Sequence, residues 1–201
     1  MNDPIKIAEM KRIIGRDVSD NVQRTDSRFA DEMNWLLDEL SEPGIFETVA
    51  IHEAGHEHYY LLAGGSGIEF IPPVVRFYRD RVMKPFGRQM AAIKVHKYLP
   101  TESDPDWYSK LAKGFAAGGE CSVRFPVLRR RRDGADFKAW TETCAEGYKG
   151  MPPAEIDQIA KKMWIDAQTV VRDELNDDVL EEKIRRRATE ITPQLFPWLR
   201  A

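Results

Sequence analysis

Apolar residues recur at three- and four-residue spacing along most of the chain, which is the pattern of amphipathic helices. The pattern predicts two helices within residues 7–40, with Thr25 or Asp26 as the cap of the second. Pro43-Gly44 interrupts it, and a further helix is predicted from about residue 46 to residue 63. The amino-terminal part of the chain should therefore be helical.

The pattern changes between residues 68 and 99, where the apolar positions come in short and partly β-branched segments. Pro72-Pro73 and Pro85-Phe86-Gly87 separate these segments from one another. We expect a small antiparallel sheet in this region. Its predicted strands are 68–71, 74–78 and 90–95.

Helical spacing resumes after the predicted sheet. Proline and aspartate at 103–106 are typical of a helix start, and the helix that they open should end at Gly118-Gly119. Further helices are predicted at 135–145, 156–171 and 179–191. The expected fold class is α+β and mostly helical, with a helical segment over 1–45 and a larger domain over 46–201, packed as one compact unit.

The composition is that of a chain with a sizeable core. Of the 201 residues 42% are hydrophobic, and 30 basic against 33 acidic residues give a formal net charge of −3, so no overall basic field is available for nucleic acid. The sequence contains no run of about 18 apolar residues, so it predicts no membrane-spanning helix. Two cysteines, Cys121 and Cys144, are too few for a disulfide framework, so we expect both to be small core residues. We also expect the chain to be in a reducing, cytoplasmic compartment.

The strongest chemical signal is His52-Glu53-Ala54-Gly55-His56, in the helix predicted over 46–63. Residues four apart lie one turn above the other, so both imidazoles can converge on one cation. Glu53 lies about 100° round the helix axis from His52 and can reach water at that cation as a general base. The motif therefore predicts a catalytic site with one zinc ion per chain.

A catalytic zinc ion takes three protein ligands and keeps a fourth position open, so a third ligand must come from elsewhere in the chain. Acidic residues beyond the predicted sheet are the candidates, and spacing alone does not rank them. They are Glu120, Asp133, Asp136 and Glu142.

From about Glu47 to the carboxyl end, the order of motifs resembles the proteolytic domain of FtsH-type zinc metallopeptidases, the membrane-anchored AAA+ proteases. Their zinc helix typically reads His-Glu-Ala-Gly-His, and a small sheet, a helix ending in Gly-Gly and an aspartate ligand follow it. The corresponding pieces here are 52–56, 68–95, 107–119 and Gly134-Ala135-Asp136-Phe137. Two details depart from the family: Asp136 follows Ala135 directly, and Glu120-Cys121-Ser122-Val123 stands where small residues and then a glutamate are usual.

The resemblance implies a zincin-like peptidase domain in which His52, His56 and Asp136 bind zinc and Glu53 is the general base. It also implies that an extended peptide binds along the edge of the strand at 90–95. The implied activity is a zinc metalloendopeptidase that hydrolyses unfolded or flexible protein segments. The chain has no Gly-x-x-x-x-Gly-Lys-[Ser/Thr] loop, so an ATPase would have to act in trans, and an oligomer stays open.

Two other functions stay open at this point. The same fold could be a non-catalytic zinc-binding adaptor or inhibitor, although Glu53 would then have no role. It could also be a site-specific regulatory protease that cleaves one partner protein. A general protease and a regulatory one share the same site residues, so the sequence does not separate them.

Three further features have alternative interpretations. His58 should point away from the metal, because it lies about 200° round the helix from His56. His96 is either a strand-end histidine or a side chain that steadies a substrate carbonyl. The basic run Arg129-Arg130-Arg131-Arg132 is either solvated surface or a binding surface for an acidic segment.

Overall fold

The computed structural model describes residues 3–78, 81, 83–98, 106–125 and 134–200 of the chain. The described part is α+β and mostly helical, as the hydrophobic pattern predicts. Its elements are, in chain order, α1 (Pro4–Ile14), α2 (Asp20–Thr25), α3 (Ser27–Leu40), α4 (Ile45–Leu62), β1 (Gly65–Ile71), β2 (Val74–Phe77), β3 (Phe86–Gln89), β4 (Ala92–Tyr98), α5 (Trp107–Arg124), α6 (Gly134–Gly147), α7 (Pro153–Glu174), α8 (Asp178–Leu195) and the 3-10 helix η1 (Pro197–Arg200).

Three of the described helices, α1, α3 and α8, begin at an aspartate side-chain cap. Asp26 caps α3 by accepting a hydrogen bond from the backbone N–H of Arg28, so one of the two predicted caps is confirmed. Asp3 and Asp177 cap α1 and α8 in the same way. The short elements α2 and η1 are not predicted, because neither is long enough to show a hydrophobic period.

The strands form two antiparallel pairs, β1 with β4 and β2 with β3. The strand predicted at 90–95 is observed as β4, which begins at Ala92 and ends at Tyr98. The strand β3 was not predicted, because it begins at Phe86, within the segment Pro85-Phe86-Gly87 that we interpreted as a break. The reason is packing: Phe86 is buried with its ring against Phe29, and a Cβ on Gly87 would lie only 2.8 Å from the ring of Tyr78. Glycine here lets a strand pass close to an aromatic ring rather than ending it.

The end predicted for the helix that follows the sheet, observed as α5, is wrong. Instead of ending at Gly118-Gly119, α5 continues to Arg124. Both glycines are buried, and the helix packs along α4 so closely that a Cβ on Gly114 would lie 2.3 Å from the ring of Tyr60. Close approach of two helices therefore overrides the usual helix-ending tendency of glycine.

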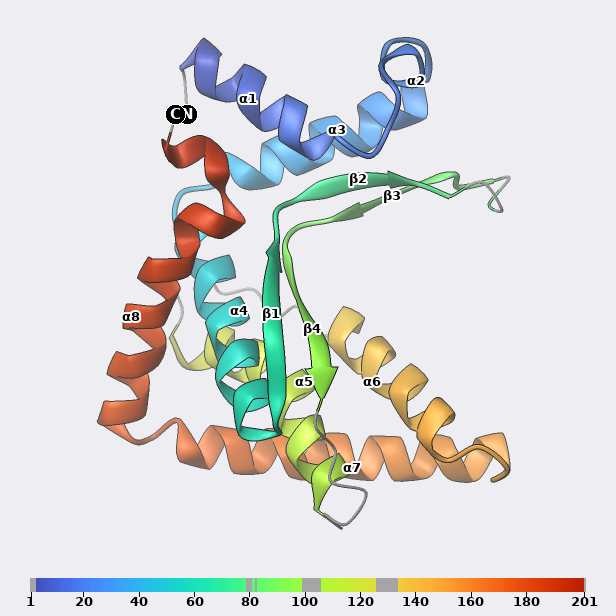
Figure 1. Cartoon of the computed structure of the whole chain (residues 1–201), viewed down its shortest axis with the longest axis vertical. Coiled ribbons are helices and arrows are strands. Elements are labelled where there is room, and N and C mark those ends of the chain that lie inside the picture. The colour runs from blue at the N-terminus through green and yellow to red at the C-terminus, as the bar shows by residue number, and fades with distance from the viewer. Residues whose placement is uncertain (1–2, 79–80, 82, 99–105, 126–133, 201) are drawn as a thin grey trace.

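Two hydrophobic clusters hold these elements together. The larger cluster joins residues of α1, α3, α4, α8 and η1 with some of α5 and α7, and the smaller one joins residues of α5, α6 and α7 with Tyr60 of α4. In Figure 1, α1 and α3 lie over the β2–β3 pair, α8 runs along one flank of α4, and α7 crosses the opposite end of the molecule. Among the described residues, no helix is long and apolar enough to cross a membrane.

Candidate metal centre

The two histidines and Glu53 lie on α4, a helix that is buried on most of its surface. The helix contacts both α5 and α8, and the sector that carries His52, Glu53 and His56 lines one cavity. His56 and Glu53 are 4% and 5% exposed. The His-Glu-x-x-His motif is therefore held inside the fold by helix packing.

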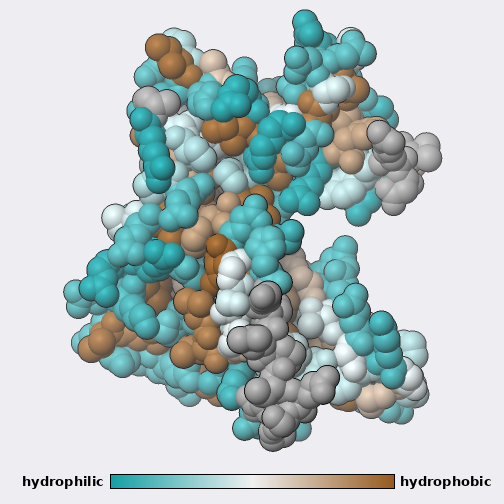
Figure 2. Space-filling model, in the orientation of Figure 1, coloured by the Kyte–Doolittle hydropathy of each residue, from teal (hydrophilic) through white to brown (hydrophobic). Residues whose placement is uncertain are grey.

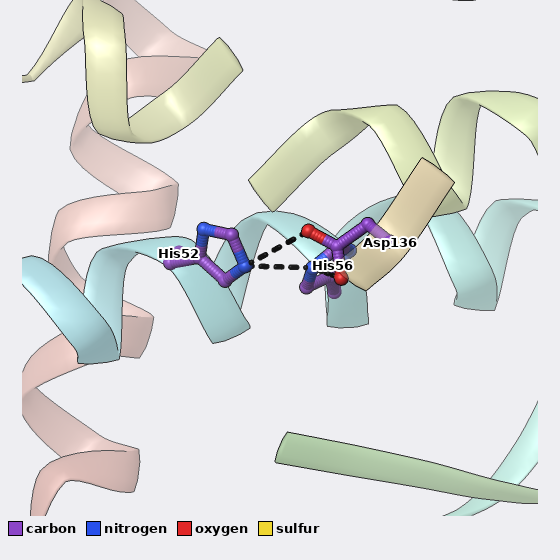
Figure 3. A group of neighbouring side chains, drawn as sticks. All are labelled: His52, His56 and Asp136. Carbon is purple, nitrogen blue, oxygen red and sulfur yellow. Dashed lines mark hydrogen bonds and ion pairs between the residues drawn. The ribbon is translucent and has the colours of Figure 1, made fainter. Parts of the chain in front are cut away.

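Asp136 completes a cluster with the two histidines from the first turn of α6. Nε2 of His52 lies 3.0 Å from Nε2 of His56, and the Asp136 oxygens lie 3.4 Å and 3.5 Å from these two nitrogens. Figure 3 shows the three side chains, from two helices far apart in the sequence, pointing at one another. The candidate ligand atoms all lie within 4.8 Å of one another, close enough for one cation to contact all three.

Each imidazole is oriented by a hydrogen bond from its other nitrogen. His56 Nδ1 lies 2.7 Å from the carbonyl oxygen of Gly114, which can only accept, so Nδ1 carries the proton. His52 Nδ1 lies 3.1 Å from the hydroxyl of Ser122. With the protons on Nδ1, both Nε2 lone pairs face the common space.

The space between the three residues fits a metal ion. A Cβ on Gly118 of α5 would lie 2.3 Å from Nε2 of His56 and 2.7 Å from Nε2 of His52, so any side chain there would enter this space. The Oδ2 atom of Asp136 is buried and accepts no hydrogen bond from the described residues. Lone pairs and a carboxylate oxygen facing one another at these distances repel unless a proton or a metal ion lies between them.

The charges of the cluster depend on one another. Burial opposes a charged imidazole, but the charge and proximity of Asp136, together with Glu53, outweigh it and raise the pKa of His56 to about 9. For Asp136, burial raises the pKa of the carboxyl, but the charge of His56 and the proximity of both histidines lower it well below its usual range. The metal-free cluster thus attracts a proton where a metal cation would bind.

Glu53 does not belong to the cluster of ligands. Burial raises the pKa of its carboxyl, even though the neighbouring His52 and His56 lower it. Glu53 and Ile93, a residue of β4, line the same cavity as the two histidines, so the carboxyl lies at the wall shared by the metal cluster and the strand. This is a suitable environment for a group that takes up and releases a proton.

The cluster opens into a cavity of about 430 Å³ between α4, α6 and the β3–β4 segment. Figure 2 shows the surface indented between the β2–β3 pair and α6. The cavity walls are mostly apolar. They include Tyr60, Met90, Ile93, Phe115 and Ala139.

The other acids considered as the third ligand lie elsewhere or are outside the described residues. Glu120 is buried on α5 and forms hydrogen bonds of 3.0 and 3.2 Å with Arg172 of α7. Glu142 is exposed on α6, with one oxygen 3.7 Å from Nζ of Lys138. Asp133 lies outside the described residues.

The remaining histidines take no part in the cluster. His58 lines a different hollow, between α4 and α8, so its predicted direction away from the metal is confirmed. His96 lies 2.8 Å from a carboxylate oxygen of Glu69 on the neighbouring strand and does not line the cavity of the cluster. Cys121 and Cys144 are buried and unpaired, as expected for core residues. The basic run at 129–132 lies outside the described residues.

Sequence reasoning missed three residues of the site: Gly114, Gly118 and Ser122. They recur every four residues on α5, so they form one stripe that faces the histidines of α4. The signal was present as small residues at 114, 118 and 122, but it is readable only if the helix continues past Gly119.

Scans against protein-family models, curated proteins and solved structures found no match to this chain.

Proposed function

We propose that this chain is a zinc-dependent metalloendopeptidase with a zincin-like fold, built like the FtsH-type peptidase domain that its motifs resemble. The observation that carries the proposal is the convergence of His52, His56 and Asp136, with Glu53 buried beside them at the wall of one cavity. Three ligands from the protein leave a fourth position for water, which is the arrangement of a catalytic zinc site.

The chemistry divides between the metal and Glu53. When bound, zinc supplies a Lewis acid that polarises the scissile carbonyl and makes water acidic enough to lose a proton near neutral pH. Glu53 takes that proton as the water attacks and delivers it to the departing amine. Its buried position and raised pKa suit both steps, because the group must hold the proton for the interval between them.

The substrate of the proposed peptidase is an extended backbone. One edge of β4 pairs with β1, while Ala92 and Ile93 of β4 also line the cavity of the metal cluster. A peptide could add to β4 as a further strand beside Glu53. This binding mode requires an unfolded or flexible segment, and a folded protein would need an ATPase in trans to open it.

The substitution Glu53→Gln tests the proposal, because it keeps the shape of the side chain and removes the base. We expect zinc binding to persist while hydrolysis of casein or another unfolded protein falls by about two to four orders of magnitude. Glu142→Gln, on the exposed surface of α6, is the matched control and should cleave like the parent. The measurements are zinc content by elemental analysis and the initial rate of cleavage.

Equal rates for the parent and Glu53→Gln would refute the assigned role of Glu53. Zinc binding without cleavage of any unfolded substrate by the parent would favour the zinc-binding adaptor or inhibitor instead.

A further inference from the structure

We propose that Ser122 is the positioning residue of the metal centre: its hydroxyl fixes the tautomer and the ring orientation of His52, so that Nε2 of His52 presents a lone pair to the metal. The inference rests on the proposed function, because it concerns the metal site of that function. It names a residue on α5 that lies outside the His-Glu-x-x-His motif and is not itself a ligand.

The direction of the hydrogen bonds follows from counting protons. The Ser122 hydroxyl has one proton, which it donates to the carbonyl oxygen of Gly118 at 2.9 Å. The same oxygen lies 3.1 Å from Nδ1 of His52 and must therefore accept there. Nδ1 of His52 then carries the ring proton, and Nε2 is left with the lone pair.

The contact is enclosed by the fold. Ser122 is 4% exposed and the side chain of His52 is 14% exposed, so water has little access to replace the hydroxyl. Within α5 the hydroxyl is anchored by its bond to Gly118, one turn earlier. Ser122 is thus held in place by its own helix before it acts on the ring from α4.

The two histidines are oriented by different kinds of partner. The partner of His56 is the carbonyl oxygen of Gly114, which no side-chain substitution removes, whereas the partner of His52 is a side chain. Loss of the Ser122 hydroxyl would allow the proton of His52 to move to Nε2 and the ring to turn. Such outer-shell partners typically contribute about 10- to 100-fold in metal affinity.

Three substitutions of Ser122 test this role. Ser122→Ala removes the hydroxyl, and Ser122→Thr and Ser122→Val add the same volume with and without a hydroxyl. Threonine in a helix can still donate to the carbonyl one turn earlier, so it should restore the contact. Thr143→Ala on α6 is the control, because it removes a hydroxyl that also donates to the carbonyl one turn earlier, at 2.9 Å, but touches no ligand.

The measurement is zinc affinity of the full chain, by competition with a chromophoric chelator, with circular dichroism to verify folding. We expect Ser122→Ala and Ser122→Val to bind zinc about 10- to 100-fold more weakly than the parent. Ser122→Thr and Thr143→Ala should stay close to the parent. In the metal-free protein, the ¹⁵N shifts of the His52 ring should report a proton on Nδ1 in the parent and a mixture of tautomers in Ser122→Ala.

The possible failures are distinguishable. A parent chain that binds no zinc would overturn the proposed function itself. A parent that binds zinc together with equally tight Ser122→Ala would overturn only the role of Ser122. If Ser122→Ala does not fold, the Thr and Val variants decide, because they differ only in the hydroxyl, and equal affinities of that pair would overturn the role.

Discussion

Glu57 and Glu120 have a different kind of partner from Asp136. Glu57 of α4 accepts hydrogen bonds of 2.6 and 2.7 Å from Arg187, and Glu120 of α5 is bound in the same manner by Arg172. Asp136 instead faces His52 and His56 at 3.4 and 3.5 Å, with a buried oxygen that accepts no hydrogen bond from the described residues. The first two carboxylates are paired with arginines, which are always charged, whereas the third faces two imidazoles, whose charge depends on a proton.

This difference separates structural charges from functional ones. A carboxylate with a bidentate arginine has its charge and its lone pairs satisfied, so it links two helices and needs nothing further. The Asp136 cluster keeps its lone pairs directed at one space, which the fold keeps open at Gly118. Polar groups arranged in this way are costly in a structural role and useful for binding a cation.

The largest effect is expected from filling that space. Gly118→Ala would put a methyl group 2.3 Å from Nε2 of His56, which is shorter than any normal contact, so the cluster should lose zinc almost completely. We expect zinc content after dialysis to fall to background, and peptidase activity with it, while circular dichroism remains that of the parent. Elemental analysis and far-ultraviolet spectra provide the two measurements.

Gly134→Ala is the matched control for this substitution. Gly134 is the first residue of α6, the helix that carries Asp136, and a Cβ there would meet no atom within 4 Å. The Gly134→Ala variant should therefore keep full zinc content. If the Gly118→Ala variant kept the zinc content of the parent, the metal would have to bind elsewhere than between His52, His56 and Asp136.

The second effect compares the two kinds of carboxylate directly. Asp136→Asn should weaken zinc binding by more than about 100-fold, because it removes a charged ligand, whereas above about pH 9, where His56 has lost its proton, it should change the unfolding midpoint of the metal-free chain little. Glu120→Gln should do the opposite: it should retain zinc and lower stability by about 1–3 kcal/mol, since it breaks a buried charged hydrogen bond. Chelator competition and urea unfolding distinguish the two, and loss of zinc in Glu120→Gln would contradict the separation.

The sequence predicts the helix that carries the His-Glu-x-x-His motif well and the opposite wall of the site poorly. The helix predicted over 46–63 is observed at Ile45–Leu62, because its limits are marked by Pro43-Gly44 and by the glycines after it. The two histidines follow from helical geometry alone. By contrast, Gly118 was interpreted as a helix end, because glycine has low helix propensity and the pattern does not reveal that another helix packs against it.

Long-range contacts explain the remaining differences. Asp136 was one of several acids in the sequence, and only the packing of α6 against α5 and α7 distinguishes it from Glu120 and Glu142. Ser122 had no signal of its own, because its role depends on a ring that lies 70 residues earlier in the chain. Local patterns specify elements, while the contacts between elements select the residues that act together.

The smallest effect is a pH dependence of the metal-free chain. In the folded state His56 has a pKa of about 9, against 6.5 for an ordinary histidine, so the folded protein holds a proton that the unfolded chain releases. The resulting stability is fully present below pH 6.5 and is lost as the pH rises through about 9. We expect the free energy of unfolding, measured with urea and a chelator present, to fall by at most about 3 kcal/mol over this window.

Zinc should reverse the sign of this dependence, because the metal needs the neutral imidazole and must displace the proton from His56. Stabilisation by a fixed zinc concentration should therefore grow between pH 6.5 and about 9, while that from the proton declines. The variant His56→Gln has no titrating ring at this position, so its metal-free stability should be flatter over the same range than that of the parent. A parent and a His56→Gln variant with the same pH profile would show that the proton is not held by the cluster, and the contrast between Asp136 and the arginine-bound carboxylates would lose its electrostatic basis.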